Sequence, residues 1–186
     1  MPFDGLVTTS VVKELHTIIP AKVDKIYQPN KYTIVLGLYS NGINYNLNIC
    51  ADANNPRLHL TWHDRQNPSI APNFCMLLRK YLSGAKLISA STSDLERVIN
   101  LSFECYNEYS DKTTKNLFVE IMGRYSNIVL TNEDGTIVDS LKHVNSSRKI
   151  LPKLEYSFPP SDKIRLVTKD LLKPIKVSSI FFPRTI

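Results

Sequence analysis

The chain is poor in the residues on which disulfide-rich folds and metal sites depend. It has only three cysteines among 186 residues. They are odd in number and widely spaced, and no Cys-x-x-Cys pair occurs, which argues against a zinc knuckle, a thioredoxin-type site or a disulfide framework. We therefore expect Cys50, Cys75 and Cys105 to be reduced and mostly buried, as in a cytoplasmic protein.

Long apolar runs and phosphate-binding glycine motifs are also missing. No window approaches the roughly 18 apolar residues that span a bilayer. Residues 1–10 contain no basic segment followed by an apolar one, so no secretory signal is visible. The six glycines form no G-x-G-x-x-G, P-loop or G-x-S-x-G motif. We expect a cytoplasmic protein without membrane contact or a cofactor.

Metal binding is not expected either. His59 and His63 are four residues apart, which is the spacing of a helical metal pair. However, residues 58–62 alternate as a strand and then enter a loop, so the two rings would not share a helix face. No third ligand lies near them in the sequence.

Positive charge is in modest excess. The formal net charge is +6, and 42% of the residues are hydrophobic, as in ordinary globular domains. This length is sufficient for a domain with its own core. The charge favours an acidic partner such as RNA, DNA or anionic lipid, although many basic domains bind none of these.

Hydrophobic periodicity predicts helices at both ends of a first group of strands. Residues 7–19 predict an amphipathic helix, with N-cap oxygens in Thr8 to Ser10 and a stop at Pro20. Asn41-Gly42 predicts a tight hairpin between two alternating runs. The first predicted strands are residues 23–28, 32–39, 43–49 and 57–61, and a second helix follows over residues 73–82.

A second group of strands follows that helix. The predicted strands are residues 85–90, 95–104, 117–121, 126–130 and 136–141. The expected class is α+β: two antiparallel β blocks forming a sandwich or pseudo-barrel flanked by helices. The pattern weakens after Pro159-Pro160. We expect one domain over residues 1–160, and a linker or truncated continuation over residues 161–186.

Two short segments carry the candidate binding residues. Glu96 and Arg97 lie within one predicted strand, and Glu120, Ile121, Met122 and Arg124 lie where another strand enters a turn at Gly123. An arginine beside a glycine that admits close backbone approach suits RNA binding. The alternative is an ion pair between Glu and Arg on neighbouring strands.

Six ordered segments resemble a known family. They read MPFDG from residue 1, VDKIYQP from 23, NPRLHLT from 55, FCMLLRKYLSG from 74, EIMGRYSN from 120 and LPKLEYSFPP from 151. Together they identify the chain as a member of the NFACT family, of which it would be the N-terminal domain. The resemblance implies a fold similar to the N-terminal domain of formamidopyrimidine-DNA glycosylases.

The resemblance also implies a function. Family members bind large ribosomal subunits that carry an obstructed nascent chain, recruit tRNA, and in bacteria support C-terminal tailing of that chain. The family's Asp-Arg pair falls on Glu96 and Arg97, where Glu replaces Asp. Its Glu-Ile-Met motif is intact at residues 120–122, followed by Arg124, with Tyr125 where a His is common. The expected RNA contacts are Glu96, Arg97, Glu120, Ile121, Met122 and Arg124.

Two alternatives stay open. The family's older name implies a surface adhesin that binds fibronectin or fibrinogen. The sequence shows no secretory signal peptide and no membrane anchor, which weighs against an adhesin. Removal of Met1 would leave Pro2 at the N-terminus. An N-terminal proline can act as a Schiff-base nucleophile in DNA glycosylases. Here Phe3 stands where those enzymes have a Glu as the acid/base. We expect no enzyme activity.

The first prediction concerns that chemistry. Borohydride reduction in the presence of abasic or oxidised-guanine DNA should trap no covalent adduct, because the chain lacks the Glu that would move the proton. A trapped species that disappears in Pro2→Gly would contradict the interpretation as a binding module.

Overall fold

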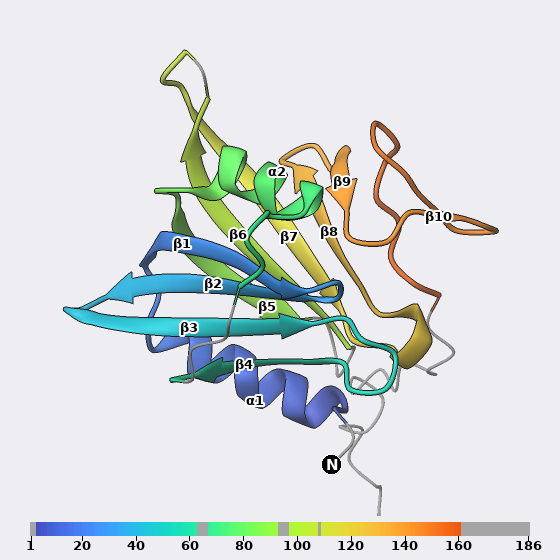
Figure 1. Cartoon of the computed structure of the whole chain (residues 1–186), viewed down its shortest axis with the longest axis horizontal. Coiled ribbons are helices and arrows are strands. Elements are labelled where there is room, and N and C mark those ends of the chain that lie inside the picture. The colour runs from blue at the N-terminus through green and yellow to red at the C-terminus, as the bar shows by residue number, and fades with distance from the viewer. Residues whose placement is uncertain (1–2, 63–66, 93–96, 108, 161–186) are drawn as a thin grey trace, which may run out of the picture.

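The structure, a computed structural model, describes residues 3–62, 67–92, 97–107 and 109–160. Two helices and nine strands of one sheet lie within these ranges (Figure 1). In chain order they are α1 (Gly5–His16), β1 (Ala21–Asn30), β2 (Thr33–Ser40), β3 (Ile43–Cys50), β4 (Arg57–Thr61), α2 (Asn73–Leu82), β5 (Lys86–Thr92), β6 (Val98–Tyr106), β7 (Lys112–Glu120), β8 (Asn127–Asn132) and β9 (Ile137–Ser140). The 3-10 turn η1 (Gly123–Tyr125) and the small β10 (Val144–Asn145) and β11 (Lys149–Ile150) pair complete the described chain. Residues 161–186 lie outside it.

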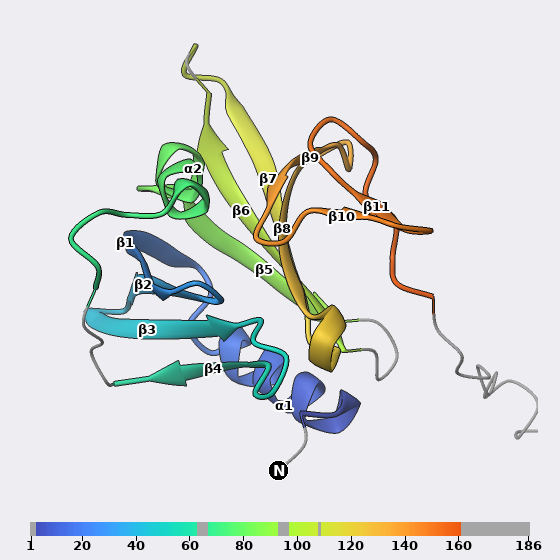
Figure 2. The same ribbon diagram turned by 45° about the vertical axis from the view of Figure 1, so that its right-hand side comes forward.

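All nine strands belong to one antiparallel sheet with the order β4-β3-β2-β1-β5-β6-β7-β8-β9. The two predicted blocks are its halves, β1–β4 and β5–β9. A short ladder joins them, in which Ala21 faces Leu87 and Lys22 faces Lys86. Figure 2 shows the strands of the two halves running across each other. The predicted class is therefore confirmed, whereas the likeness to the glycosylase domain stays a prediction.

The core lies between the two halves. Period-two alternation sends every second side chain of each strand inward. Leu36 and Leu47 come from the first half, Leu101 and Leu117 come from the second, and all four are fully buried. Helix α1 packs on β4, β5 and β6, and α2 packs on β1, β6 and β9. The helices thus close the sandwich along two of its sides.

Helix α1 begins earlier than predicted. The Asp4 carboxylate accepts hydrogen bonds from the amides of Leu6 and Val7, both at 3.0 Å, which makes Asp4 the N-cap. The predicted cap within Thr8 to Ser10 is wrong, because these residues already lie inside the helix. The Thr8 hydroxyl donates instead to the Asp4 carbonyl at 2.8 Å. Helix α2 has the predicted bounds, 73–82.

The hairpin between β2 and β3 is confirmed. Asn41 and Gly42 have φ angles of 51° and 81°, as the two central residues of a type I′ turn require. The larger differences lie in the second half. Strand β6 begins at Val98, so Arg97 lies in a bend before the strand and not within it, and β7 begins at Lys112, well before the predicted residue 117.

All three cysteines are buried and free. Burial raises the pKa of the Cys75 and Cys105 thiols, so these groups stay protonated near neutral pH. None of the helices in the described part of the chain is both long and apolar enough to cross a bilayer.

The Asp4 cap gives the second prediction. Asp4→Ala should lower the free energy of unfolding by about 1 kcal/mol, because two helix amides lose their acceptor. Asp4→Asn, which keeps an acceptor oxygen, should cost much less. Urea unfolding of both variants measures this, and equal losses in the two would show that the cap does not contribute.

Candidate nucleic-acid interface

A cleft of about 550 Å³ lies where β7 ends. One wall holds the residues next to the 3-10 turn, and the other holds residues of the C-terminal segment, 142–160. Four of the six predicted residues line this cleft: Arg97, Glu120, Met122 and Arg124. Ile121 is 1% exposed and belongs to the core instead. Glu96 lies outside the described residues.

Backbone hydrogen bonds bring the two motif segments together. The Ile121 amide donates to the Arg97 carbonyl at 2.8 Å, which ties the bend before β6 to the end of β7. Gly123, with φ of 56°, starts the 3-10 turn in a left-handed conformation that favours glycine. The Met122 amide donates to Ser126 Oγ at 2.8 Å and so closes the turn.

Arg124 and Tyr125 form an exposed pair on this turn. An Arg124 Nη donates to the Tyr125 hydroxyl at 2.6 Å, and the guanidinium carbon lies 4.7 Å from the centre of the Tyr125 ring. Both side chains face solvent. The pair holds a charged fork and an aromatic surface side by side, which suits phosphate or base recognition.

Glu120 has a different environment. Its carboxylate is 1% exposed and accepts from both Nη atoms of Arg148, one of them at 3.0 Å. The Tyr156 hydroxyl donates to the same carboxylate at 2.8 Å. Burial disfavours the charge of Arg148, but the hydrogen bonds and negative charge of Glu120 outweigh it and raise the pKa of Arg148. Burial and then the Glu120 charge raise the pKa of Tyr156, which remains a neutral donor.

This ion pair fastens the C-terminal segment to the sheet. Arg148 Nε also donates to the Ser157 carbonyl at 2.8 Å, and the Tyr156 ring stacks on Phe118 of β7 with centroids 4.1 Å apart. Beneath these contacts lies a small second core of Val98, Phe118, Val129, Ile137 and Ile150. Glu120 thus has an arginine partner, as the alternative interpretation expected, but that arginine comes from the C-terminal segment and not from a neighbouring strand. Glu120 acts as a positioning residue for one wall of the cleft.

Lys142 links the cleft to the first half of the sheet. Its Nζ donates to the Ala51 carbonyl at 2.7 Å and lies 4.9 Å from the centre of the Tyr32 ring. Burial lowers the pKa of Lys142. Sequence reasoning missed Lys142 and Arg148, although residues 142–149 hold four of the basic or imidazole side chains, a local cluster that could have indicated them.

The charge balance of the cleft is strongly positive. Among the residues that the structure describes, its lining contains four cationic side chains, Arg97, Arg124, Lys142 and Arg148, and a single carboxylate, that of Glu120. That carboxylate is fully engaged by Arg148 and Tyr156. A polyanion that enters the cleft would therefore meet the exposed arginines and not the acid.

Comparisons with known proteins identify the family of this chain. A family model described as the NFACT N-terminal and middle domains matches residues 4–179. The chain belongs to the NFACT family. This NFACT chain is 39% identical over 171 residues to the Rqc2 homolog RqcH of Bacillus subtilis, a match covering 88% of this chain and 30% of that protein. It is 34% identical over 154 residues to the archaeal Rqc2 homolog aRqcH of Methanocaldococcus jannaschii, a match covering 81% of this chain and 22% of that protein. The chain spans less than a third of the length of each of these two relatives.

Solved structures share the fold of this NFACT chain. The N-terminal domain of fibronectin-binding protein PavA from Streptococcus pneumoniae aligns with a TM-score of 0.82 at 34% identity, over 86% of this chain and 62% of that one. The fibrinogen-binding protein from Staphylococcus aureus aligns with a TM-score of 0.79 at 30% identity, over 87% of this chain and 58% of that one.

The third prediction tests the role of Glu120. Glu120→Ala should lower the free energy of unfolding by about 3 kcal/mol, because the Arg148 charge and the Tyr156 hydroxyl lose their buried acceptor. Glu104→Ala is the matched control on the adjacent strand. This variant removes an ion pair in which Glu104 Oε2 lies 2.6 Å from Nζ of the exposed Lys112. Because solvent screens this pair, the free energy of unfolding should change little. Equal, small effects in the two variants would mean that the Glu120 pair does not fasten the segment.

Proposed function

We propose that this domain binds tRNA in the cleft at the end of β7. The observation that carries the proposal is the described part of the cleft lining, in which four cationic side chains stand against one engaged carboxylate. Arg97 and Arg124 are the main contacts, because both are exposed and both line the cleft. The family resemblance associates the pair at Glu96 and Arg97 with tRNA binding, and Arg124 matches the residue that follows the family's Glu-Ile-Met motif.

The chemistry of the two arginines supports this choice. A guanidinium stays charged and presents a planar fork of donors that can hold a phosphate through two hydrogen bonds or stack on a splayed base. Tyr125, 65% exposed beside Arg124, adds an aromatic surface for such a base. Glu96 is expected to orient Arg97 and not to touch phosphate, since two anions repel each other.

Within the whole protein, we place the domain in ribosome quality control. There it would hold tRNA while the full-length factor binds a large ribosomal subunit with an obstructed nascent chain and supports C-terminal tailing of that chain in the cytoplasm. Membership of the NFACT family and the relatives named as Rqc2 homologs support this. The domain would act as a binding module and not as an enzyme.

A second candidate function comes from the names of the solved structures. PavA is a fibronectin-binding protein, and the Streptococcus suis structure, with a TM-score of 0.82 and 35% identity over 86% of this chain, is a fibronectin/fibrinogen-binding protein. The binding experiment therefore includes a fibronectin arm.

The fourth prediction concerns Arg97 and Arg124. Arg97→Ala and Arg124→Ala should each weaken tRNA binding by about 1–3 kcal/mol, the range for a charge-assisted hydrogen bond. A plot of the logarithm of the binding constant against the logarithm of salt concentration has a negative slope. Each lost phosphate contact should reduce the magnitude of this slope by a little under about one unit. Arg97→Lys should recover only part of the affinity, because it restores charge without the fork. Electrophoretic shifts with total tRNA across a salt series measure these changes.

Lys13→Ala, which removes an exposed cation on α1, is the matched control and should bind tRNA as the wild type does. Circular dichroism verifies that each variant is folded. If both arginine variants keep full affinity at every salt concentration, the cleft does not hold tRNA. If the wild type binds fibronectin but no tRNA, the adhesin interpretation replaces this one.

A further inference from the structure

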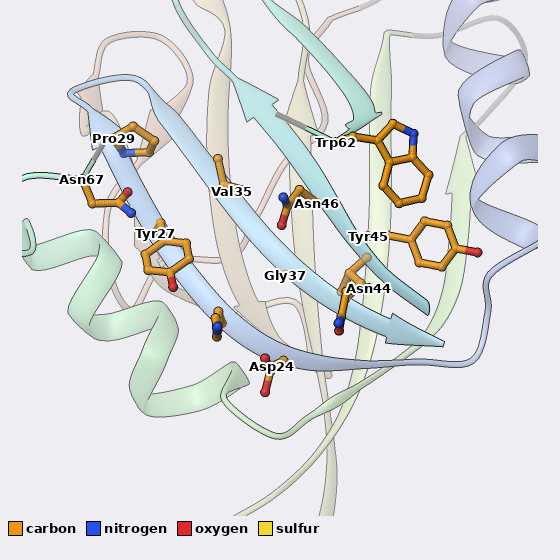
Figure 3. A pocket seen from close by; sticks show the side chains of 12 residues that line it. Asp24, Tyr27, Pro29, Val35, Gly37, Asn44, Tyr45, Asn46, Trp62 and Asn67 are labelled. Atoms are coloured by element: carbon orange, nitrogen blue, oxygen red, sulfur yellow. The ribbon is translucent and has the colours of Figure 1, made fainter. Parts of the chain in front are cut away.

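A second hollow lies on the first half of the sheet, apart from the cleft. Its volume is about 560 Å³, and β1, β2, β3 and the chain just beyond β4 line it (Figure 3). Within the described ranges, it shares no lining residue with the cleft. Its chemistry also differs, because aromatic rings and amides predominate where the cleft has cations.

Gly37, in the middle of β2, belongs to the lining of the hollow (Figure 3). Its φ is not in the left-handed region, so the backbone does not demand glycine there. A Cβ at this position would lie 3.3 Å from the Cβ of Lys25, directly across on β1, where a bulge lies between Val23 and Lys25. Gly37 therefore leaves room for the close approach of the β1 backbone and adds no side chain to the floor of the hollow.

Aromatic side chains stand on both sides of that floor. Tyr45 and Trp62 contact each other with ring centroids 5.6 Å apart, and Trp62 is 72% exposed. In Figure 3 the side chains of Asn44 and Asn46 lie between Tyr27 on one side and Tyr45 and Trp62 on the other. A tryptophan so exposed beside a hollow is a common feature of binding surfaces.

These groups match the chemistry of a nucleobase. Aromatic faces favour a flat ring, and stacking on them tolerates any base. A side-chain amide such as that of Asn44 has both donors and an acceptor, which is what the polar edge of a base requires. The exposed ammonium of Lys25 at the rim can meet the attached phosphate.

We propose that this hollow binds an unpaired nucleobase of the RNA that the domain holds, as a second contact separate from the cleft. The proposal rests on the proposed function, since it takes RNA to be the partner. The two contacts differ physically. The cleft holds phosphate through charge and depends on salt, whereas the hollow holds a base through stacking and amide hydrogen bonds and depends on salt only weakly.

Trp62 provides the readout, because it is the only tryptophan of the chain. A single-stranded RNA of about six nucleotides, within the usual range for a stacking site, should quench Trp62 fluorescence to saturation. Tyr27→Ala and Asn44→Ala should each weaken this binding, Tyr27→Ala by about tenfold or more. Neither variant should change the salt slope of tRNA binding, in contrast to Arg97→Ala.

Tyr109→Ala, which removes a tyrosine that is 85% exposed on the β6–β7 hairpin, is the matched control and should leave the titration unchanged. Several outcomes would overturn the inference. One is that tRNA binds and depends on Arg97 and Arg124 while the short RNA leaves Trp62 unaffected, in which case the proposed function stands without the second contact. Another is quenching by a free monosaccharide but not by RNA, which would assign the hollow to a sugar. By contrast, quenching by the short RNA that persists in the Arg97 and Arg124 variants is the result that a hollow separate from the cleft predicts.

Discussion

The buried pair between Glu120 and Arg148 is the interaction on which the cleft depends. It joins the last residue of β7 to a segment that follows much later in the chain, and the Tyr156 hydroxyl completes the shell of the carboxylate. A buried carboxylate with one partner missing is costly, so the two elements hold each other in place. Without this contact the C-terminal segment would lose its ion pair to the end of β7. The Glu-Ile-Met motif can therefore be divided by role: Glu120 positions a wall, Ile121 fills the core and Met122 lines the cleft.

The sheet places two chemically different surfaces on its two halves. The second half carries the cationic cleft, and the first half carries the aromatic hollow beside Trp62. Lys142 connects the halves near the cleft through its bond to the Ala51 carbonyl, and the short β1–β5 ladder joins them along the sheet. Such an arrangement suits a partner that offers both phosphates and unpaired bases, which single-stranded regions of a folded RNA do.

Local patterns were sufficient to predict much of the fold. Helix α2 has the predicted bounds, and the Asn41-Gly42 hairpin was recognised because both residues favour positive φ. The start of α1 was missed because Asp4 and the run from Thr8 to Ser10 both offer N-cap oxygens, and sequence alone does not rank them. The predicted strand includes Arg97 because this residue directly precedes the apolar pair Val98-Ile99, and sequence alone does not fix the first residue of a strand. The partners of Glu120 could not be predicted, since Arg148 and Tyr156 approach it through long-range contacts that leave no periodic signal. The two motifs were identified by resemblance, and only the structure brought them to one cleft.

The central claim is that Glu120 acts by holding the C-terminal segment on the sheet. Hydrogen–deuterium exchange of the wild type and Glu120→Gln tests it most directly, because the substitution keeps the shape of the side chain and removes its charge. The account predicts faster exchange in residues 144–158, including the Lys153 amide that donates to the Ile137 carbonyl, with β1 to β4 unchanged. Unchanged exchange across residues 144–158 would contradict it, as would an equal increase throughout the sheet.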